Sequence, residues 1–265
     1  MNTTSQTPAV TGLSLTVAGL CVEVAQRHLV EDLEFAAKPG QFIAMLGENG
    51  VGKTLTLHTL AGLRAPTSGA VRLGDRGLQE WPRRDLARAL GLLAQSSEDP
   101  FPSTVLESAL IGRHPHLDFW QWESEADVAI ARAALEQVDL AAREDRAIDT
   151  LSGGERRRLA IATILTQDPG VFLLDEATNH LDPHHQLDVL ALFRARADAG
   201  RVVIASLHDA TLAARFADQA LLLYGDGSWN FGPVAHVLDT PHLSRLYRTP
   251  VHELEFRGRR VFVNE

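Results

Sequence analysis

Short apolar segments alternate with segments of helical periodicity along most of the chain. The segments Gln41–Leu46, Val171–Leu174 and Val202–Ser206 are almost wholly apolar, and a pattern of helical spacing follows each of them. Strands that are apolar on both faces are typical of a mostly parallel sheet covered by helices on both sides, so the pattern predicts an α/β fold. Further strands are expected at Leu13–Val24, Leu29–Phe35, Ala70–Leu73, Leu90–Leu93 and Gln219–Tyr224, and helices at Lys53–Leu63, Gly153–Gln167, His184–Ala199 and Ala210–Ala217.

One segment interrupts this alternation. It is helical in pattern, most clearly over Ala126–Val138, and it carries Trp120 and Trp122. The two tryptophans have two open interpretations, as core of a small helical subdomain or as part of an interface. We expect one domain over residues 1–265, with 11–98 and 151–265 forming the core and a β subdomain, and 99–150 forming an inserted helical subdomain.

Composition and charge narrow the classes of function. The chain has 265 residues and a formal net charge of -9, and this acidity argues against a large nucleic-acid interface. No segment reaches the roughly 18 apolar residues of a membrane helix. A secretion signal would require a positively charged start, but no Lys or Arg precedes Arg27. The single cysteine, Cys21, excludes an internal disulfide and is expected to be a buried thiol. We therefore expect a cytoplasmic protein without a membrane span.

A glycine-rich loop carries the strongest chemical signal. Residues 47–54 match the phosphate-loop pattern G-x-x-x-x-G-K-[ST], between a predicted strand and a predicted helix. The loop amides and the helix N-terminus can bind phosphate oxygens, while Lys53 offers a positive charge and Thr54 a ligand for Mg²⁺. An ordinary glycine-rich turn is the weaker alternative, because Lys38 and Lys53 are the only lysines in the chain. The expected nucleotide-binding residues are Gly47, Glu48, Asn49, Gly50, Val51, Gly52, Lys53 and Thr54.

Two acidic residues follow the apolar strand Val171–Leu174. We expect this strand to lie beside the strand of the phosphate loop, so that Asp175 reaches Mg²⁺ and Glu176 the attacking water. Gln95 and His208, which follow other strands, are candidates for contacts to Mg²⁺ or water and to the γ-phosphate. Taken singly, each of these side chains is as well explained by a solvated loop, a surface position or a structural histidine. Together with the phosphate loop they predict a site that hydrolyses a nucleotide.

A second glycine motif lies between the two halves of this site. Leu151-Ser152-Gly153-Gly154-Glu155 opens a predicted helix, for which a plain serine N-cap is the simpler explanation. The motif resembles the signature of the ATP-binding cassette (ABC) family, and the resemblance extends from about Leu13 to the C-terminus. It implies a head-to-tail dimer of two copies, in which these residues of one chain face the ATP held by the other: Ser152, Gly153, Gly154 and Glu155.

The resemblance also implies a fold and further residue roles. The fold is a P-loop NTPase cassette with a mostly parallel core sheet, an N-terminal antiparallel β subdomain and the inserted helical subdomain. Glu176 is implied as the catalytic base and His208 as the switch histidine. Gln95 is implied as the Q-loop residue that joins the catalytic core to the helical subdomain, and ATP and Mg²⁺ are the implied cofactors. The stretch Asn179-His180-Leu181-Asp182 resembles the D-loop, which touches the partner subunit.

The sequence departs from the family pattern at two places. Ala177 stands where proline often follows the catalytic glutamate. Val24 occupies the region of the aromatic residue that stacks on adenine in many members, and Arg27 and His28 are the candidates to replace that residue. We therefore expect the affinity for adenine nucleotides to depend mainly on phosphate contacts.

Weaker features resemble the importers of iron–siderophore complexes, haem or cobalamin. The resemblance implies an ATP hydrolase at the cytoplasmic face of the inner membrane that powers separate integral membrane permease subunits. A periplasmic or surface substrate-binding protein is then an indirect partner, and no nucleic acid is expected. A permease coupling helix would lie near Gln95 and the segment Pro100–Trp122. The features are Glu80-Trp81 with Arg83–Ala89, Ile111–His116, and Leu246–Val251 with a hairpin at Leu254–Val263.

Other functions remain open at this level. A soluble ABC ATPase acting on ribosomes or DNA is disfavoured, because the chain has one cassette and no coiled-coil insertion. An importer or exporter of another cargo is a further alternative. A regulator that binds ATP without cleaving it is disfavoured by the presence of both Glu176 and His208.

Two clusters outside these motifs have their own alternatives. His180 and His184 have a spacing that can bind metal, but Pro183 separates them, so a solvated or dimer-contact role is preferred. The basic run Arg156–Arg158 could suggest nucleic acid, although a partly solvated helix face is the preferred interpretation.

Overall fold

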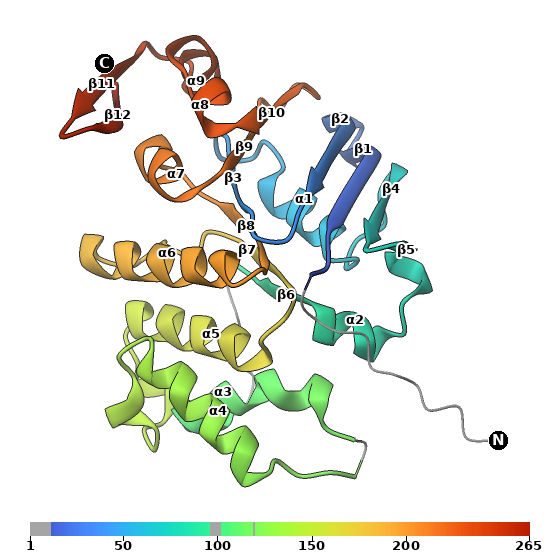
Figure 1. Ribbon diagram of the computed structural model, residues 1–265, viewed down its shortest axis with the longest axis vertical. Helices are drawn as coiled ribbons and strands as arrows, with labels where there is room; N and C mark the ends of the chain where they lie inside the picture. The colour runs from blue at the N-terminus through green and yellow to red at the C-terminus, as the bar shows by residue number, and fades with distance from the viewer. Residues whose placement is uncertain (1–11, 96–101, 119) are drawn as a thin grey trace.

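The computed structural model describes residues 12–95, 102–118 and 120–265, so the expected domain boundaries at residues 11 and 99 lie outside it. A six-stranded sheet forms the centre of the molecule (Figure 1). Five neighbouring strands are parallel and one edge strand is antiparallel, which confirms the expected mostly parallel core. The strand order is β10 (Trp229–Pro233), β9 (Gln219–Leu223), β3 (Phe42–Leu46), β8 (Val202–Ser206), β7 (Val171–Leu174) and β6 (Leu90–Leu93).

Alternate residues of the central strands feed two apolar layers. Phe42 and Phe172 point into the layer shared with three helices, α5 (Gly153–Gln167), α6 (Pro183–Asp198) and α7 (Ala210–Phe216). The opposite layer contains Ile43 and Leu173 and is covered by α1 (Lys53–Leu60) and an antiparallel sheet. That sheet has the order β2 (Arg27–Ala37), β1 (Leu15–Val24), β4 (Ser68–Leu73) and β5 (Arg76–Gly77), and the chain returns from it through η1 (Leu78–Glu80) and α2 (Arg83–Ala89).

A group of short helices packs against α5 below the sheet in Figure 1. The Thr104 and Ser124 side chains cap the two α-helices of this group through reciprocal bonds with Glu107 and Asp127, which fixes where these helices begin. The apolar core runs without a break from these helices through α5 to the sheet. The group consists of α3 (Val105–Leu110), η2 (Ile111–His116), α4 (Glu125–Glu136), η3 (Ala141–Arg143) and η4 (Ile148–Thr150).

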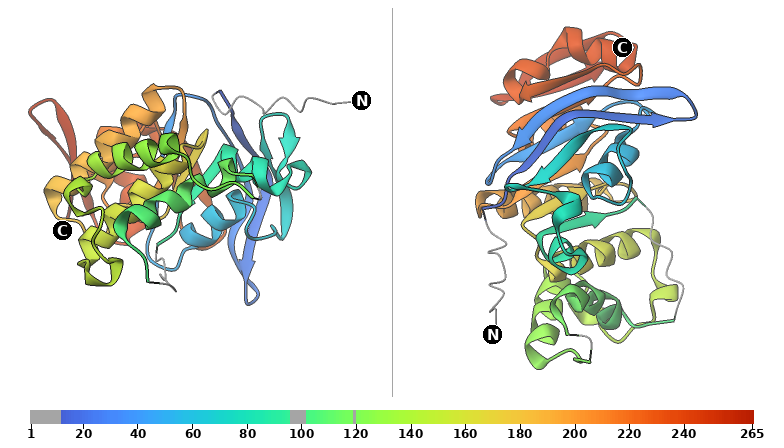
Figure 2. Two further views of the ribbon diagram at one scale, coloured as in Figure 1. Left: turned by 90° about the horizontal axis from the view of Figure 1, so that it is seen from below. Right: turned by 90° about the vertical axis from the view of Figure 1, so that its right-hand side faces the viewer.

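The C-terminal segment lies at the end of the molecule opposite the group of short helices, as Figure 1 and the right view of Figure 2 show. It comprises α8 (Val234–Val237), α9 (Thr240–Tyr247), β11 (Val251–Phe256) and β12 (Arg259–Asn264). The Phe262 amide donates to Thr211 Oγ1 at 3.0 Å, which fastens the hairpin to α7. No helix in the described part of the chain has both the length and the apolar character needed to cross a bilayer.

One expectation about the sheet is wrong. The strand that ends before Asp175 does not lie beside the phosphate-loop strand, because β8 lies between β3 and β7. Apolar patterning identifies each strand, but the sideways order depends on where each crossover helix returns the chain, and all three strands are buried and almost wholly apolar. As a result Ser206, which pairs in register with Met45, lies at the carboxyl end of β8, between the phosphate loop and the two acidic residues.

Two smaller expectations also change. The first helix ends at Leu60 instead of Leu63, because Gly62 turns the chain at a φ of 71°. Cys21 is half-buried instead of buried, since it lies at a register shift of β1 where its sulfur contacts the Asp32 amide at 3.3 Å.

Candidate functional site

The phosphate loop connects β3 to α1 and forms one wall of a cavity of about 480 Å³. Gly50 and Gly52 adopt φ values of 80° and 106°, which side-chain-bearing residues rarely adopt. Gly52 is the N-cap of α1 and offers no side chain to the first helical amides, so these amides can bind an anion. The cavity is lined by Asn49, Gly50, Gly52, Lys53, Thr54, Leu55, Gln95, Glu176, Asn179, His180 and His208.

Lys53 is buried at the start of α1, and its ammonium group lies inside the loop. Its Nζ donates to the carbonyl oxygens of Gly47 at 2.7 Å and Glu48 at 2.9 Å. Burial lowers the pKa of Lys53, while the charges of Glu176 and then Asp175 oppose that shift. A desolvated ammonium held by two neutral carbonyls interacts strongly with any phosphate that enters the loop.

Asp175 lies at the carboxyl end of β7 and is completely buried. Its Oδ1 atom accepts a hydrogen bond from Ser206 Oγ at 2.8 Å, whereas its Oδ2 atom has no hydrogen-bond partner in the described structure. A buried carboxylate oxygen without a donor is costly unless a cation binds it. No group of three or more His, Cys, Asp or Glu side chains that could hold a metal exists among the described residues. A single carboxylate suits Mg²⁺, which commonly takes one or two carboxylates together with phosphate oxygens.

The Glu176 carboxylate contacts other side chains that the sequence predicted for this site. Its Oε2 atom accepts from Gln95 Nε2 at 2.7 Å and from Asn179 Nδ2 at 2.5 Å, and its Oε1 atom lies 3.0 Å from His208 Nε2. The Glu176 backbone has a φ of 51°, an uncommon conformation that turns the side chain from the strand end into the cavity. Three segments separated in sequence therefore meet on one carboxylate.

The structure adds Ser206, which the sequence analysis did not single out. Ser206 is completely buried, donates to Asp175 and accepts from the Glu176 amide at 2.7 Å. It thus orients both acids at once. The available signal was a hydroxyl at the end of the otherwise apolar strand Val202–Ser206, two residues before His208. Because the expected strand order was wrong, this hydroxyl was not expected to lie beside the two acidic residues.

We predict that Ser206→Ala lowers kcat by about fivefold to tenfold, because a buried oxygen and a buried amide lose their shared partner. The Mg²⁺ concentration needed for half-maximal activity should rise as well, since the Asp175 carboxylate loses its orientation. Steady-state ATPase assays over a magnesium series measure both quantities. Ser108→Ala, at another buried serine in α3, is the matched control and should change neither. Unchanged kcat and magnesium dependence in Ser206→Ala would contradict the orienting role.

The signature residues do not join this cavity within one chain. Ser152 is the N-cap of α5, as the simpler explanation expected, and it also forms a capping box with Glu155. Glu155 also pairs with Arg143. A Cβ atom added at Gly153 would meet nothing within 4 Å, whereas one at Gly154 would lie 3.2 Å from the His180 carbonyl. Packing inside the chain therefore explains the glycine at 154 but not the one at 153.

The remaining sequence candidates lie in different parts of the structure. His180 lines the cavity, while His184 lies 3.4 Å from Asp188, so the two do not form a metal pair. Val24 is exposed at the end of β1 and does not line the cavity, and its role toward a base stays a prediction. The basic run is partly solvated, as expected: Arg156 is exposed, whereas Arg157 is buried.

Sequence comparisons place this geometry among known proteins. Residues 30–179 match the model of the ABC transporter family. The chain is 39% identical over 234 residues to a hemin import ATP-binding protein HmuV of Gloeobacter violaceus, with 86% of this chain and 84% of that protein covered. It is 40% identical to the HmuV protein of Pseudomonas entomophila, covering 86% and 87%. It is 34% identical to the achromobactin transport ATP-binding protein CbrD of Dickeya dadantii, covering 85% and 84%.

Structural comparison agrees with these relatives. A chain of an inward-facing, putative metal-chelate type ABC transporter superposes with a TM-score of 0.83 at 26% identity, covering 96% of this chain and 98% of that chain. An ATP-bound bacterial Atm1-family ABC exporter superposes with a TM-score of 0.77 at 24% identity and covers 93% of this chain and 44% of that chain, which is a similarity of fold.

Proposed function

Because the chain belongs to the ABC transporter family, as an ATP-hydrolysing import subunit, we propose that two copies bind head to tail around two Mg–ATP complexes and drive uptake of a metal chelate. The carrying observation is the site on Glu176, where residues from three loops meet at the edge of a phosphate-loop cavity. The cargo class follows the names of relatives, which include hemin import and achromobactin transport proteins. An iron–siderophore complex, haem or cobalamin is the cargo class that we propose.

The residues of one chain divide the hydrolytic work among them. Lys53 and the loop amides bind the β- and γ-phosphates. Glu176 accepts the proton of the attacking water, and His208 lies beside it to contact the γ-phosphate. Asp175, Thr54 and Gln95 are the residues that would hold Mg²⁺, which neutralises charge on the phosphate oxygens.

The second copy supplies the signature residues that the nucleotide cavity of the first copy lacks. Ser152 and Gly153 are exposed at the N-terminus of a 15-residue helix and lie outside the cavity of their own chain. The open space above Gly153 leaves room for another molecule to approach the backbone closely. The positive end of α5 favours a phosphate there, so the partner's ATP is the occupant that we propose.

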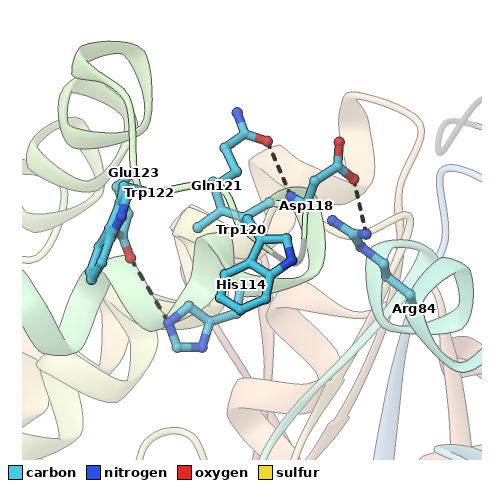
Figure 3. Close-up of a pocket in the computed structure, with 8 residues that line it drawn as sticks. Arg84, His114, Asp118, Trp120, Gln121, Trp122 and Glu123 are labelled. Carbon is cyan, nitrogen blue, oxygen red and sulfur yellow. Dashed lines mark hydrogen bonds and ion pairs between the residues drawn. The ribbon is translucent and has the colours of Figure 1, made fainter.

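A groove of about 630 Å³ between Arg84 of α2 and the group of short helices is the proposed permease contact (Figure 3). Trp120 and Trp122 are 89% and 86% exposed, so their interpretation as core is wrong. The groove is framed by an ion pair between Arg84 and Asp118 at 3.1 Å. Exposed tryptophans beside a polar rim suit a protein interface. This contact would place the subunit peripherally at the cytoplasmic face of the membrane. A substrate-binding protein would then be an indirect partner, and we expect no nucleic acid to bind.

The proposed function predicts that the chain co-purifies with a multispanning membrane protein and that its ATPase activity rises on assembly. Replacing Trp120 and Trp122 together by Ser should weaken that association at least about tenfold, because large aromatic anchors supply much of an interface's affinity. ATPase activity of the isolated chain should stay within about twofold, since neither residue lines the nucleotide cavity. Phe256→Ser, at another exposed aromatic residue, is the matched control. Equal co-purification of the double variant and the control would remove this surface from the proposal.

A further inference from the structure

Arg157 is a buried arginine whose hydrogen bonds all reach main-chain carbonyl groups. The side chain lies on α5, five residues after the N-cap Ser152, and is 7% exposed. Its Nη1 atom donates to Ala94 O at 2.6 Å and lies 3.4 Å from Gln95 O. Its Nε and Nη2 atoms donate to Ala177 O, at 3.4 Å, and to Asp175 O. One guanidinium group therefore joins three segments of the chain.

Two of these segments carry the side chains that meet in the cavity. Ala94 and Gln95 follow β6, and the Gln95 amide donates to the Glu176 carboxylate. Asp175 and Ala177 flank Glu176 directly. The five donors of arginine lie in one rigid plane, so the side chain fixes the relative position of the loops that it bridges.

Burying this charge is costly, and packing alone does not require it. Burial lowers the pKa of Arg157, and Asp175 and then Glu176 oppose that shift through their charges. An apolar or amide side chain could fill the same helix position without that cost. The charge thus has a use in holding the four carbonyl groups.

We propose that Arg157 is a positioning residue, which holds the helix that begins with the signature motif in a fixed position relative to the Gln95–Glu176 pair of the same chain. This inference rests on the proposed function. The start of α5 faces the ATP bound by the partner, while Arg157 on the same helix holds the catalytic loops of its own chain. When α5 shifts to close over the partner's ATP, Arg157 therefore moves the Glu176 carboxylate beside the ATP of its own chain.

The neighbouring Arg158 provides a matched comparison. It lies on the same turn of α5 and also donates to carbonyl groups, those of Val138 at 2.9 Å and Asp139 at 3.4 Å. These acceptors follow α4 and have no contact with the nucleotide cavity. Loss of Arg158 thus removes a similar side chain and similar hydrogen bonds without touching the catalytic loops.

Arg157→Gln should lower kcat at least about tenfold while the KM for ATP and the affinity for a non-hydrolysable ATP analogue stay within about threefold. Arg157→Lys should regain part of kcat, because an ammonium group can still donate to some of the carbonyls. Arg158→Gln should keep kcat within about twofold. Melting temperatures of all three variants are measured first, and the assays are run well below them.

Hydrogen exchange gives a readout that does not depend on activity. The Asp175 amide donates to Leu93 O at 2.8 Å and the Glu176 amide to Ser206 Oγ. Both amides should exchange about tenfold faster in folded Arg157→Gln and at the unvaried rate in Arg158→Gln. Unchanged exchange, or a loss of melting temperature in Arg157→Gln with kcat retained, would show a purely structural arginine and overturn the proposal. An unvaried protein without ATPase activity would defeat the proposed function instead, and exchange would still decide the role of Arg157.

Discussion

Glu176→Gln is expected to reduce kcat at least about 100-fold while ATP stays bound, because a general base contributes about 10² to 10⁴ to the rate. The carboxylate accepts from Gln95 and Asn179 on one oxygen and lies beside His208 through the other. An amide has the same shape but one accepting oxygen, so it cannot accept a water proton and loses part of this network. Slow turnover should leave a long-lived dimer with trapped nucleotide.

The measurement combines steady-state ATPase assays with size-exclusion chromatography in ATP and Mg²⁺. Glu144→Gln is the matched control, because Glu144 pairs with Arg132 on the surface of the helical segment and lies outside the cavity. The control should hydrolyse ATP normally and should not accumulate as a dimer. Normal hydrolysis by Glu176→Gln would show that another group is the base.

Local motifs made the phosphate loop predictable from the sequence. The strand Gln41–Leu46, the glycines after it and Lys53 are consecutive, so the pattern defines their geometry without knowledge of the rest of the fold. The same holds for the capping box of Ser152 and Glu155, which are three residues apart and bond each other reciprocally. Features that depend on neighbours in sequence were thus within reach.

Features that depend on which strands are adjacent in the sheet could not be predicted from the sequence. The acidic strand was expected beside the loop strand, but β8 lies between them. Ser206 and Arg157 act on the acids across distances of 30 and 18 residues, respectively, through bonds that no local pattern encodes. A polar side chain within an apolar strand and an arginine facing the core side of a helix were the only available signals. Both signals gain meaning once the strand order is known.

Lys53→Ala is expected to weaken nucleotide binding about 100-fold, because it removes a buried ammonium from the phosphate loop. Gly153→Asp should bind ATP normally in a single chain, since a Cβ atom at this position meets nothing within 4 Å there. The added carboxylate should nevertheless prevent closure, because it would repel the partner's triphosphate. Binding of a fluorescent ATP analogue to each isolated variant separates these two defects. Loss of binding in monomeric Gly153→Asp would count against its assignment to the partner's site.

Mixing these variants tests whether the site is shared between chains. Both substitutions are placed on Glu176→Gln chains, so that any intact site keeps its ATP. A head-to-tail dimer of one Lys53→Ala chain and one Gly153→Asp chain has one intact phosphate loop facing one intact signature, and should occlude about one ATP. A dimer of a chain with both substitutions and a chain with neither contains the same changes but no intact site, and should occlude none. The two heterodimers are separated from homodimers before nucleotide is counted. The reverse result, with occlusion only in the second heterodimer, would show that each chain completes its own site.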